Sequence, residues 1–359
     1  MISKRLGIVK NIKSENDLIQ DLFVDIHGDI QRAYNYIQIS GKAKVGDRVI
    51  MNTTAVELSL GTGGFHYIIT NLDNPESSFT EGGHIMKLRY TPIQIKVDSV
   101  EEQGSPYHDT IKNFTDLDKL PVAIGELHSI IPPFVATFKK ICPNKRLVYI
   151  MTDGAALPLA FSKNIDILKK KGLLENTITY GNAFGGDYEC VNIYTALITA
   201  KEICKADCVI IAMGPGIAGT GTKYGFSGID QGMIIDAVEN MGGESFIIPR
   251  ISFSDSRDRH NGISHHTMTI LKDIANKQTN VVINNGYDRQ KIEKMIVQLS
   301  QNDINSKHKI IYAKYNDTKK DLDNYDLKVR SMGRTYDEDS ELFDASSCVA
   351  SVIAKKLNE

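Results

Sequence analysis

The fold is decided by the stretch Cys208-Val-Ile-Ile-Ala-Met-Gly-Pro-Gly-Ile-Ala-Gly-Thr-Gly-Thr-Lys-Tyr-Gly-Phe-Ser-Gly228. Residues 208–213 are apolar and β-branched in the middle, which predicts a strand buried on both faces. A helix is expected from about Ile229 to the Gly242-Gly243 pair. Between them lies a loop with six glycines, whose N–H groups an anion can approach closely: Gly214, Gly216, Gly219, Gly221, Gly225 and Gly228.

Three interpretations of this loop stay open. Gly214, Gly216 and Gly219 satisfy the G-x-G-x-x-G pattern of dinucleotide sites. In that fingerprint the helix opens within the motif, whereas here about nine further loop residues precede it, and no acidic residue closes the next strand. The loop can instead hold another anionic ligand, for which Gly221 is a further candidate, or it can form a turn without a ligand.

Composition is that of an ordinary folded protein. The chain has 359 residues, 42% of them hydrophobic and 24% charged, with a net charge of -2. This charge gives no bulk attraction to nucleic acid or to an anionic membrane, so neither is an expected partner. No apolar run of membrane length exists and the first residues lack the core of a secretion signal, so we expect a cytoplasmic protein. The five scattered cysteines are expected to be reduced and buried.

The pattern of apolar residues and turn signals divides the chain into three parts. Residues 1–100 show short alternating runs separated by turn signals, such as that at residues 61–64, and predict a small all-β, barrel-like domain. Residues 101–120 show neither period and are expected as a linker. From residue 121 to 359, strands and helices alternate, which predicts a mostly parallel sheet covered on both faces, a Rossmann-like three-layer α/β domain. Strands are expected at 146–151, 177–180, 208–213, 245–251, 280–283 and 309–313, and the first helix at 125–140.

Ligands of such sheets bind at the carboxyl ends of the strands, so the residues that follow each strand are site candidates. Asp153 follows the first expected strand and Asp187 lies in the loop after the second. An aspartate in such a place binds a ribose hydroxyl, a metal or a substrate amine, although Asp-Gly also makes turns. We expect Asp153 to act in catalysis and Asp187 to bind a cofactor.

The densest candidate segment is Asp255-Ser-Arg-Asp-Arg-His-Asn-Gly-Ile-Ser-His-His-Thr267. Ser264 resembles an N-cap, which would place two histidines in the first turn of the next helix as neutral bases or metal ligands. The candidate catalytic residues are His260, His265 and His266, and the candidate metal ligands are Asp255, His265 and His266. Arg257 and Arg259 offer forked donors for a phosphate or carboxylate. The alternative is an arginine–aspartate network that fixes a long loop.

Four segments together resemble a bacterial family catalogued as domain of unknown function 3866. They are Gly83-His-Ile-Met-Lys-Leu-Arg-Tyr-Thr-Pro92, Met151-Thr-Asp-Gly-Ala-Ala-Leu-Pro158, the loop from Gly214-Pro215-Gly216 to Gly225-Phe-Ser-Gly228, and Arg257-Asp-Arg-His260 through Ser264-His-His-Thr267. The resemblance covers nearly the whole chain and implies no particular activity.

Two functions of different classes follow from these patterns. The first is a cytoplasmic enzyme that acts on a small anionic substrate by hydrolysis or group transfer, with a divalent metal or a nucleotide-like anion as cofactor. The second is a non-catalytic protein that senses a metabolite through the same loops or assembles as a homodimer. Ligand binding and turnover discriminate between them.

Overall fold

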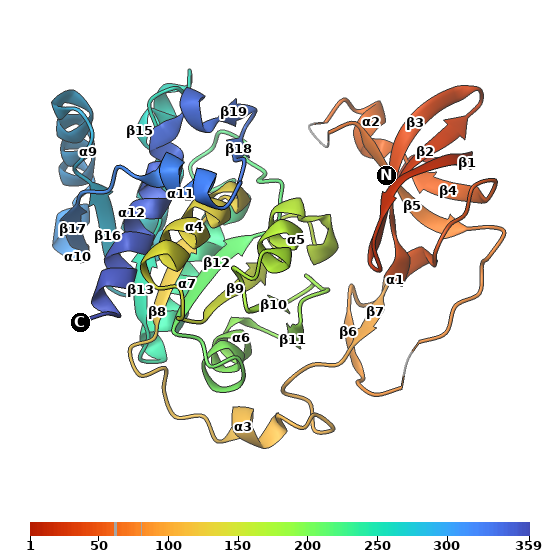
Figure 1. Cartoon of the computed structure of the whole chain (residues 1–359), viewed down its shortest axis with the longest axis horizontal. Coiled ribbons are helices and arrows are strands. Elements are labelled where there is room, and N and C mark those ends of the chain that lie inside the picture. Colours follow the sequence, from red (N-terminus) through yellow and green to blue (C-terminus); the bar gives the residue numbers. More distant parts are fainter. Residues whose placement is uncertain (61–62, 80) are drawn as a thin grey trace. The chain divides into compact units, whose positions relative to one another are not determined.

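The computed structural model describes residues 1–60, 63–79 and 81–359, which form two compact units (Figure 1). The first unit contains Met1–Gly82 and Met86–Lys96, and the second contains Gly83–Ile85 and Val97–Glu359. Residues 101–120, expected as a linker, group with the second unit and include α3 (His108–Lys112). The turn expected at 61–64 falls partly on residues 61 and 62, outside the described part of the chain.

The first unit is a closed five-stranded barrel, as its alternating runs predicted. The strands follow the order β1-β2-β3-β5-β4, and β1 pairs with β4 to close the barrel. They are β1 (Lys4–Glu15), β2 (Ile19–Ile26), β3 (Asp29–Tyr36), β4 (Arg48–Asn52) and β5 (Phe65–Asn71). Short helices α1 (Ile37–Ser40) and α2 (Thr54–Glu57) follow β3 and β4, and β6 (Ile85–Lys87) pairs with β7 (Ile95–Val97). Alternate strand residues such as Leu22, Val24 and Met51 fill the barrel core.

The second unit is built on an eight-stranded sheet with the order β11-β10-β9-β12-β8-β13-β16-β17, in which every neighbouring pair is parallel. The strands are β8 (Pro121–Gly125), β9 (Leu147–Thr152), β10 (Asn176–Tyr180), β11 (Tyr188–Cys190), β12 (Cys208–Met213), β13 (Glu244–Ile247), β16 (Asn280–Asn284) and β17 (Lys309–Ala313). The predicted strand 208–213 is confirmed, and all six of its residues are buried.

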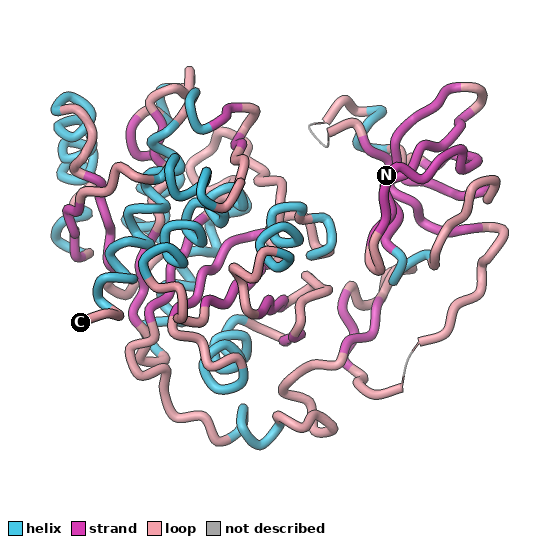
Figure 2. The backbone as a smooth tube through the Cα atoms, in the orientation of Figure 1, coloured by secondary structure: helices cyan, strands magenta, loops and turns pink. Residues whose placement is uncertain are grey.

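Alternate residues of the central strands face two separate hydrophobic cores, so helices cover both faces of the sheet (Figure 2). In β12, Val209 and Ile211 belong to one core and Ile210 belongs to the other. The first core is completed by α6 (Ile193–Ile198), α7 (Gln231–Asn240), α8 (His265–Thr269) with its continuation Ile270–Ile274, and α9 (Arg289–Gln301). The second is completed by α4 (Ile131–Ile141), α5 (Lys163–Lys170), α11 (Thr318–Asn324) and α12 (Ser340–Lys356).

The central strand β8 was not predicted: no element was expected at residues 121–124, and the helix was expected to start at residue 125, which is the last residue of β8. The helix begins only at Ile131, with Pro132 and Pro133 in its first turn, where proline is tolerated. The chain leaves β8 toward α4 on one face, whereas the neighbouring strands β12 and β13 lead to α7 and α8 on the other face. Such a reversal opens a crevice at the carboxyl ends of the strands.

Smaller elements complete the second unit. They are α10 (Ile304–Lys307), the pair β14 (Ile251–Ser252) and β15 (Gly262–Ile263), and the pair β18 (Arg330–Ser331) and β19 (Arg334–Thr335). All five cysteines are free and buried, as expected. In the described part of the chain, no helix has both the length and the apolar character that a membrane span requires.

Candidate functional site

Loops from three neighbouring strands bring polar side chains together at the crevice beside β8. Glu126 directly follows β8, Arg250 follows β13, and the glycine loop 214–228 follows β12. The segment between β13 and α8 adds the histidines. The prediction that distant segments share the carboxyl edge of the sheet is therefore confirmed for the glycine loop and for the histidines.

A buried ion pair forms the floor of the site. The Nη1 group of Arg250 donates to Oε1 of Glu126 at 2.8 Å, and Nδ1 of His266 lies 3.2 Å from the same oxygen. All three residues are at most 5% exposed. Burial alone would raise the pKa of Glu126, but the hydrogen bond from His266 and the charge of Arg250 outweigh it and hold that pKa below its ordinary value. The other carboxylate oxygen, Oε2, is buried without a hydrogen-bond partner among the described residues.

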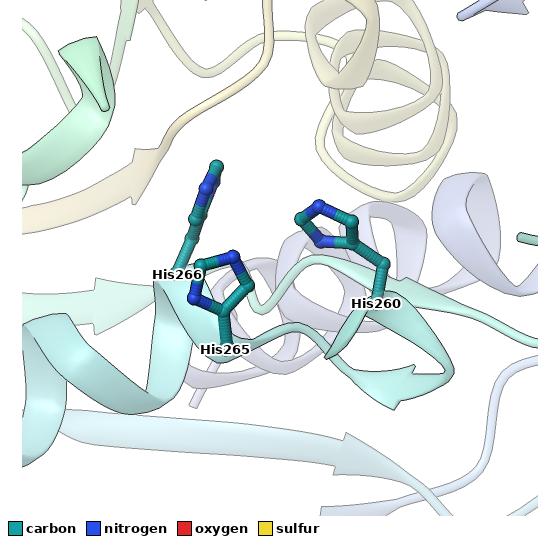
Figure 3. Close-up of side chains that lie close together, drawn as sticks. All are labelled: His260, His265 and His266. Atoms are coloured by element: carbon teal, nitrogen blue, oxygen red, sulfur yellow. The ribbon is translucent and has the colours of Figure 1, made fainter. Parts of the chain in front are cut away.

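His266 also belongs to a cluster of three histidines, with His260 and His265 (Figure 3). One ring nitrogen each from His260, His265 and His266 lies within 4.8 Å of the other two. Nδ1 of His260 is 2.7 Å from Oγ of Ser264. The same Oγ accepts the backbone N–H of His266, so the predicted N-cap is confirmed and α8 begins at His265. The cap therefore fixes two of the three imidazoles at once.

The surroundings favour neutral imidazoles. Burial lowers the pKa of His260 to about 3, with a further contribution from the charges of Arg250 and Arg257. Burial also lowers the pKa of His265 to about 4, helped by His266 and Arg259. Both rings are therefore neutral near pH 7, and each offers a nitrogen lone pair to a proton or a metal ion.

The glycine loop packs directly on the histidines. The ring of Phe226 stacks on His266, with centroids 3.9 Å apart and planes 4° from parallel. A Cβ atom on Gly219 would lie 3.7 Å from Cε1 of His266, and one on Gly221 would lie 3.8 Å from the Arg259 guanidinium. Gly216 and Gly221 also adopt positive φ angles of 105° and 78°. Gly214 approaches a different segment, since its Cβ would lie 2.2 Å from the carbonyl oxygen of Ala156.

A hollow of about 160 Å³ opens above these residues. It is lined by Ile217, Gly219, Gly221, Arg250, Arg257, Arg259, His260, His266 and Met332. A second hollow of about 280 Å³ shares Arg259 and is also lined by His265, Asp258 and Lys272. Arg259 is exposed and has no hydrogen-bond or ion-pair partner among the described residues. Its guanidinium is therefore available to a ligand in either hollow.

Asp255 does not join the candidate metal ligands. Its carboxylate accepts two hydrogen bonds from Arg257, at 2.8 and 2.7 Å, and lies 3.4 Å from Arg334. The hydrogen bonds from Arg257 hold the pKa of Asp255 far below its ordinary value despite its burial. Arg334 also donates to the buried Asp339, which accepts from Ser252 at 2.9 Å. The metal role predicted for Asp255 is corrected: this carboxylate fixes the loop, and His260 takes its place in the cluster.

The two remaining aspartates are not members of the histidine cluster. Asp153 follows β9 at the carboxyl edge, where it accepts the backbone N–H of Asn182 at 3.1 Å, and among the described residues it is not grouped with His260, His265 and His266. Asp187 precedes β11 and accepts the N–H of Thr177, near the amino end of β10, at 2.8 Å. Its expected place at the carboxyl edge is corrected, because residues 181–187 carry the chain back toward the amino end of β10, where the unpredicted parallel strand β11 begins.

A second buried histidine at this edge has a structural role. Nε2 of His128 is 2.6 Å from Oγ of Ser162, which also accepts the N–H of Ile165 as the N-cap of α5. Nδ1 of His128 donates to the carbonyl oxygen of Met213 at 3.1 Å. These bonds join the ends of β8 and β12 and leave His128 without a free nitrogen.

His128 is expected to make stability depend on pH. Burial lowers its pKa to about 4, whereas an unfolded histidine titrates near about 6.5. Between these values the unfolded chain binds the extra proton, so stability falls as the pH is lowered through this window, by at most about 1.4 kcal/mol per pH unit for one group. Urea unfolding at pH 7 and pH 5 should show a smaller decrease for His128→Gln than for the wild type. Equal decreases in the two proteins would contradict this assignment.

The sequence pattern missed Glu126, Arg250, Phe226 and Met332. The signal for Glu126 was present in the short apolar run 121–125, which ends in Gly-Glu as a strand followed by a polar loop does. Arg250 is separated from Glu126 by 124 positions, so only the parallel pairing of β8 with β13 brings them together. No local pattern carries that pairing.

Comparison with known proteins places the chain in a family. The family model described as "Protein of unknown function (DUF3866)" matches residues 32–350. The chain belongs to this family. The match confirms the resemblance found in the sequence and includes every residue of the site. No curated protein matches the chain. Among solved structures, a mutant of the PilB minor pilin from Streptococcus sanguinis aligns at 10% identity with a TM-score of 0.18, over 90% of this chain and 78% of that one.

Proposed function

We propose that this member of the DUF3866 family is an enzyme that acts on a small substrate bearing a phosphate or carboxylate group, by hydrolysis or group transfer. We infer a Rossmann-like, three-layer arrangement for the second unit, in which the crevice beside β8 is the expected ligand site. The observation that carries the proposal is the unpaired guanidinium of Arg259 in the same hollow as His260 and His266.

Recognition of the anion is assigned to the arginines. Arg250 is neutralised by Glu126 and Arg257 by Asp255, so Arg259 supplies the uncompensated positive charge. Its forked donors suit a phosphate or carboxylate, and the outer N–H groups of Arg257 can share the contact. The glycine loop closes the hollow without side chains at Gly219 and Gly221, which leaves space for the ligand.

The histidines supply the reactive groups. His260 and His266 line the hollow of the anion, and each ring offers a nitrogen that can hold a metal ion or move a proton. The larger hollow shares Arg259 and includes His265, so it has room for the rest of the substrate. This arrangement places imidazole nitrogens beside the anion, where they can hold a metal ion or move a proton, as hydrolysis and group transfer require.

Replacement of Arg259 tests the proposal. Inorganic phosphate, pyrophosphate and a panel of phosphorylated and carboxylated metabolites are added to the purified protein, and its melting temperature is measured. A ligand at about 100 times its Kd stabilises by about 2.7 kcal/mol, so the wild type should melt at a higher temperature with at least one of these anions. Arg259→Gln should lose most of this shift.

Arg289→Gln is the matched control, because Arg289 is an exposed arginine of α9 whose side chain pairs with Glu293 and with no other of the described residues. It should keep the full shift. Absence of any anion-dependent shift in the wild type, or an equal shift in Arg259→Gln, would overturn the proposal.

A metabolite sensor is the second candidate, since the same hollow can hold an anion without turnover. Product formation from the anion that stabilises the protein decides between the two functions. The homodimer expected from the sequence stays a prediction, which the mass of the protein in solution tests.

A further inference from the structure

We propose that His260, His265 and His266 together bind one divalent transition-metal ion of the zinc class. The proposal concerns the site of the proposed function, and as a cofactor assignment it rests on that function. Binding of the ion does not depend on it and is tested separately.

The positions of the three rings fit such an ion. One nitrogen from each ring lies within 4.8 Å of the others, and the ring centroids are 4.4, 5.0 and 5.1 Å apart. Zinc–nitrogen bonds of about 2.0–2.1 Å in a tetrahedral site require donors about 3.3 Å apart. The cluster is therefore a slightly open form of a three-histidine site, with the rings converging from a loop and the first turn of one helix (Figure 3).

Two polar groups contact the histidine rings as the orienting partners of metal-binding histidines do. Metal-binding histidines use their second ring nitrogen to bond a carboxylate, hydroxyl or carbonyl group. Nδ1 of His266 contacts the Glu126 carboxylate, and Nδ1 of His260 contacts the Ser264 hydroxyl. Because these contacts use Nδ1, Nε2 is the nitrogen of His260 and of His266 that can bind the ion.

Two buried polar atoms have no partner at this site. Nε2 of His265 and Oε2 of Glu126 are buried without a hydrogen bond among the described residues. Burying a polar group without a partner is unfavourable, so a folded protein rarely leaves two such atoms at one site. A cation bound to His265 removes one of these costs directly and adds an attraction to the Glu126 carboxylate.

The nearby arginines do not prevent cation binding. Arg250 and Arg257 are each paired with a buried carboxylate, which cancels their charges within the site. Of these three arginines, only Arg259 has no carboxylate partner among the described residues, and it lines both hollows. Three protein ligands leave an open position on a zinc-class ion, where an oxygen of the substrate anion or a water molecule can bind.

Direct titration with metal tests the proposal. The full-length protein is treated with a chelator, dialysed and titrated with Zn²⁺ by calorimetry and with Co²⁺ by visible absorption. The wild type should bind one ion per chain and give the intense visible spectrum of four-coordinate Co²⁺. His265→Gln, which changes a partly exposed ring, should weaken binding at least about 100-fold, more than the 10–100-fold typical for an orienting partner.

His27→Gln is the control, since His27 is an exposed histidine of the barrel and should leave binding unchanged. A wild type that binds neither ion, or a His265→Gln variant that binds as tightly, would overturn the metal assignment. If phosphate still stabilises such a protein through Arg259, the proposed function stands with proton transfer alone. If the metal binds and no anion does, the metal site stands and the proposed function fails.

Discussion

Replacing Glu126 with alanine is expected to lower the free energy of unfolding by about 3–5 kcal/mol, because Arg250 would keep a buried charge without a partner. Arg250 is 5% exposed and Glu126 is 3% exposed, so water cannot replace the lost carboxylate at little cost. Nδ1 of His266 would lose its acceptor as well. Urea unfolding followed by circular dichroism measures the change.

The double variant with Glu126→Leu and Arg250→Met separates the ion pair from general damage to the core. Removing both charges and filling the space with apolar groups is often neutral for stability. We therefore expect the double variant to recover most of the lost free energy of unfolding. A loss below about 1 kcal/mol in Glu126→Ala would contradict the buried pair as described, since that is the range of an exposed pair.

Gly214→Val is expected to destabilise the protein by about 3 kcal/mol, at the upper end of the usual cost of overpacking. A Cβ atom at Gly214 would lie 2.2 Å from the carbonyl oxygen of Ala156, which is a backbone atom and cannot rotate away. The two loops are also joined there, because the N–H of Ala156 donates to the carbonyl oxygen of Pro215 at 3.1 Å. The start of the glycine loop would have to move.

Gly104→Val is the matched control for this substitution. A Cβ atom at Gly104 meets no atom within 4 Å, and Gly104 is exposed. This variant should change the melting temperature little. If Gly214→Val is as stable as Gly104→Val, then Gly214 is not required by packing against Ala156, and a role in ligand contact becomes its explanation.

The elements that local patterns determine were predictable. The strand at 208–213, the glycine loop after it and the alternation of strands and helices follow from apolar runs and glycine placement, and the structure has them at these positions. The N-cap at Ser264 was predictable too, because a serine before a helix accepts a backbone N–H within two or three residues. Each of these signals is carried by neighbouring residues within one segment of the chain.

The parts that depend on strand order were not predictable. β8 is only five residues long and begins with a proline, so no strand was predicted there, and the pairing of Glu126 with Arg250 could not be predicted. Asp187 was misplaced because the three residues of β11 make no recognisable run. Asp255 carries the same side chain as a metal ligand, and only the three-dimensional position of Arg257 and Arg334 shows that it is already paired.

Histidine side-chain NMR during a titration with inorganic phosphate tests the central claim most directly, because it reports on the anion and on the cluster at once. The account predicts that ring resonances of His260, His265 and His266 shift together with a single Kd, that the shifts decrease strongly in Arg259→Gln, and that His27 and His308 do not respond. Resonances of the three clustered histidines that stay unchanged while phosphate shifts other parts of the protein would contradict it.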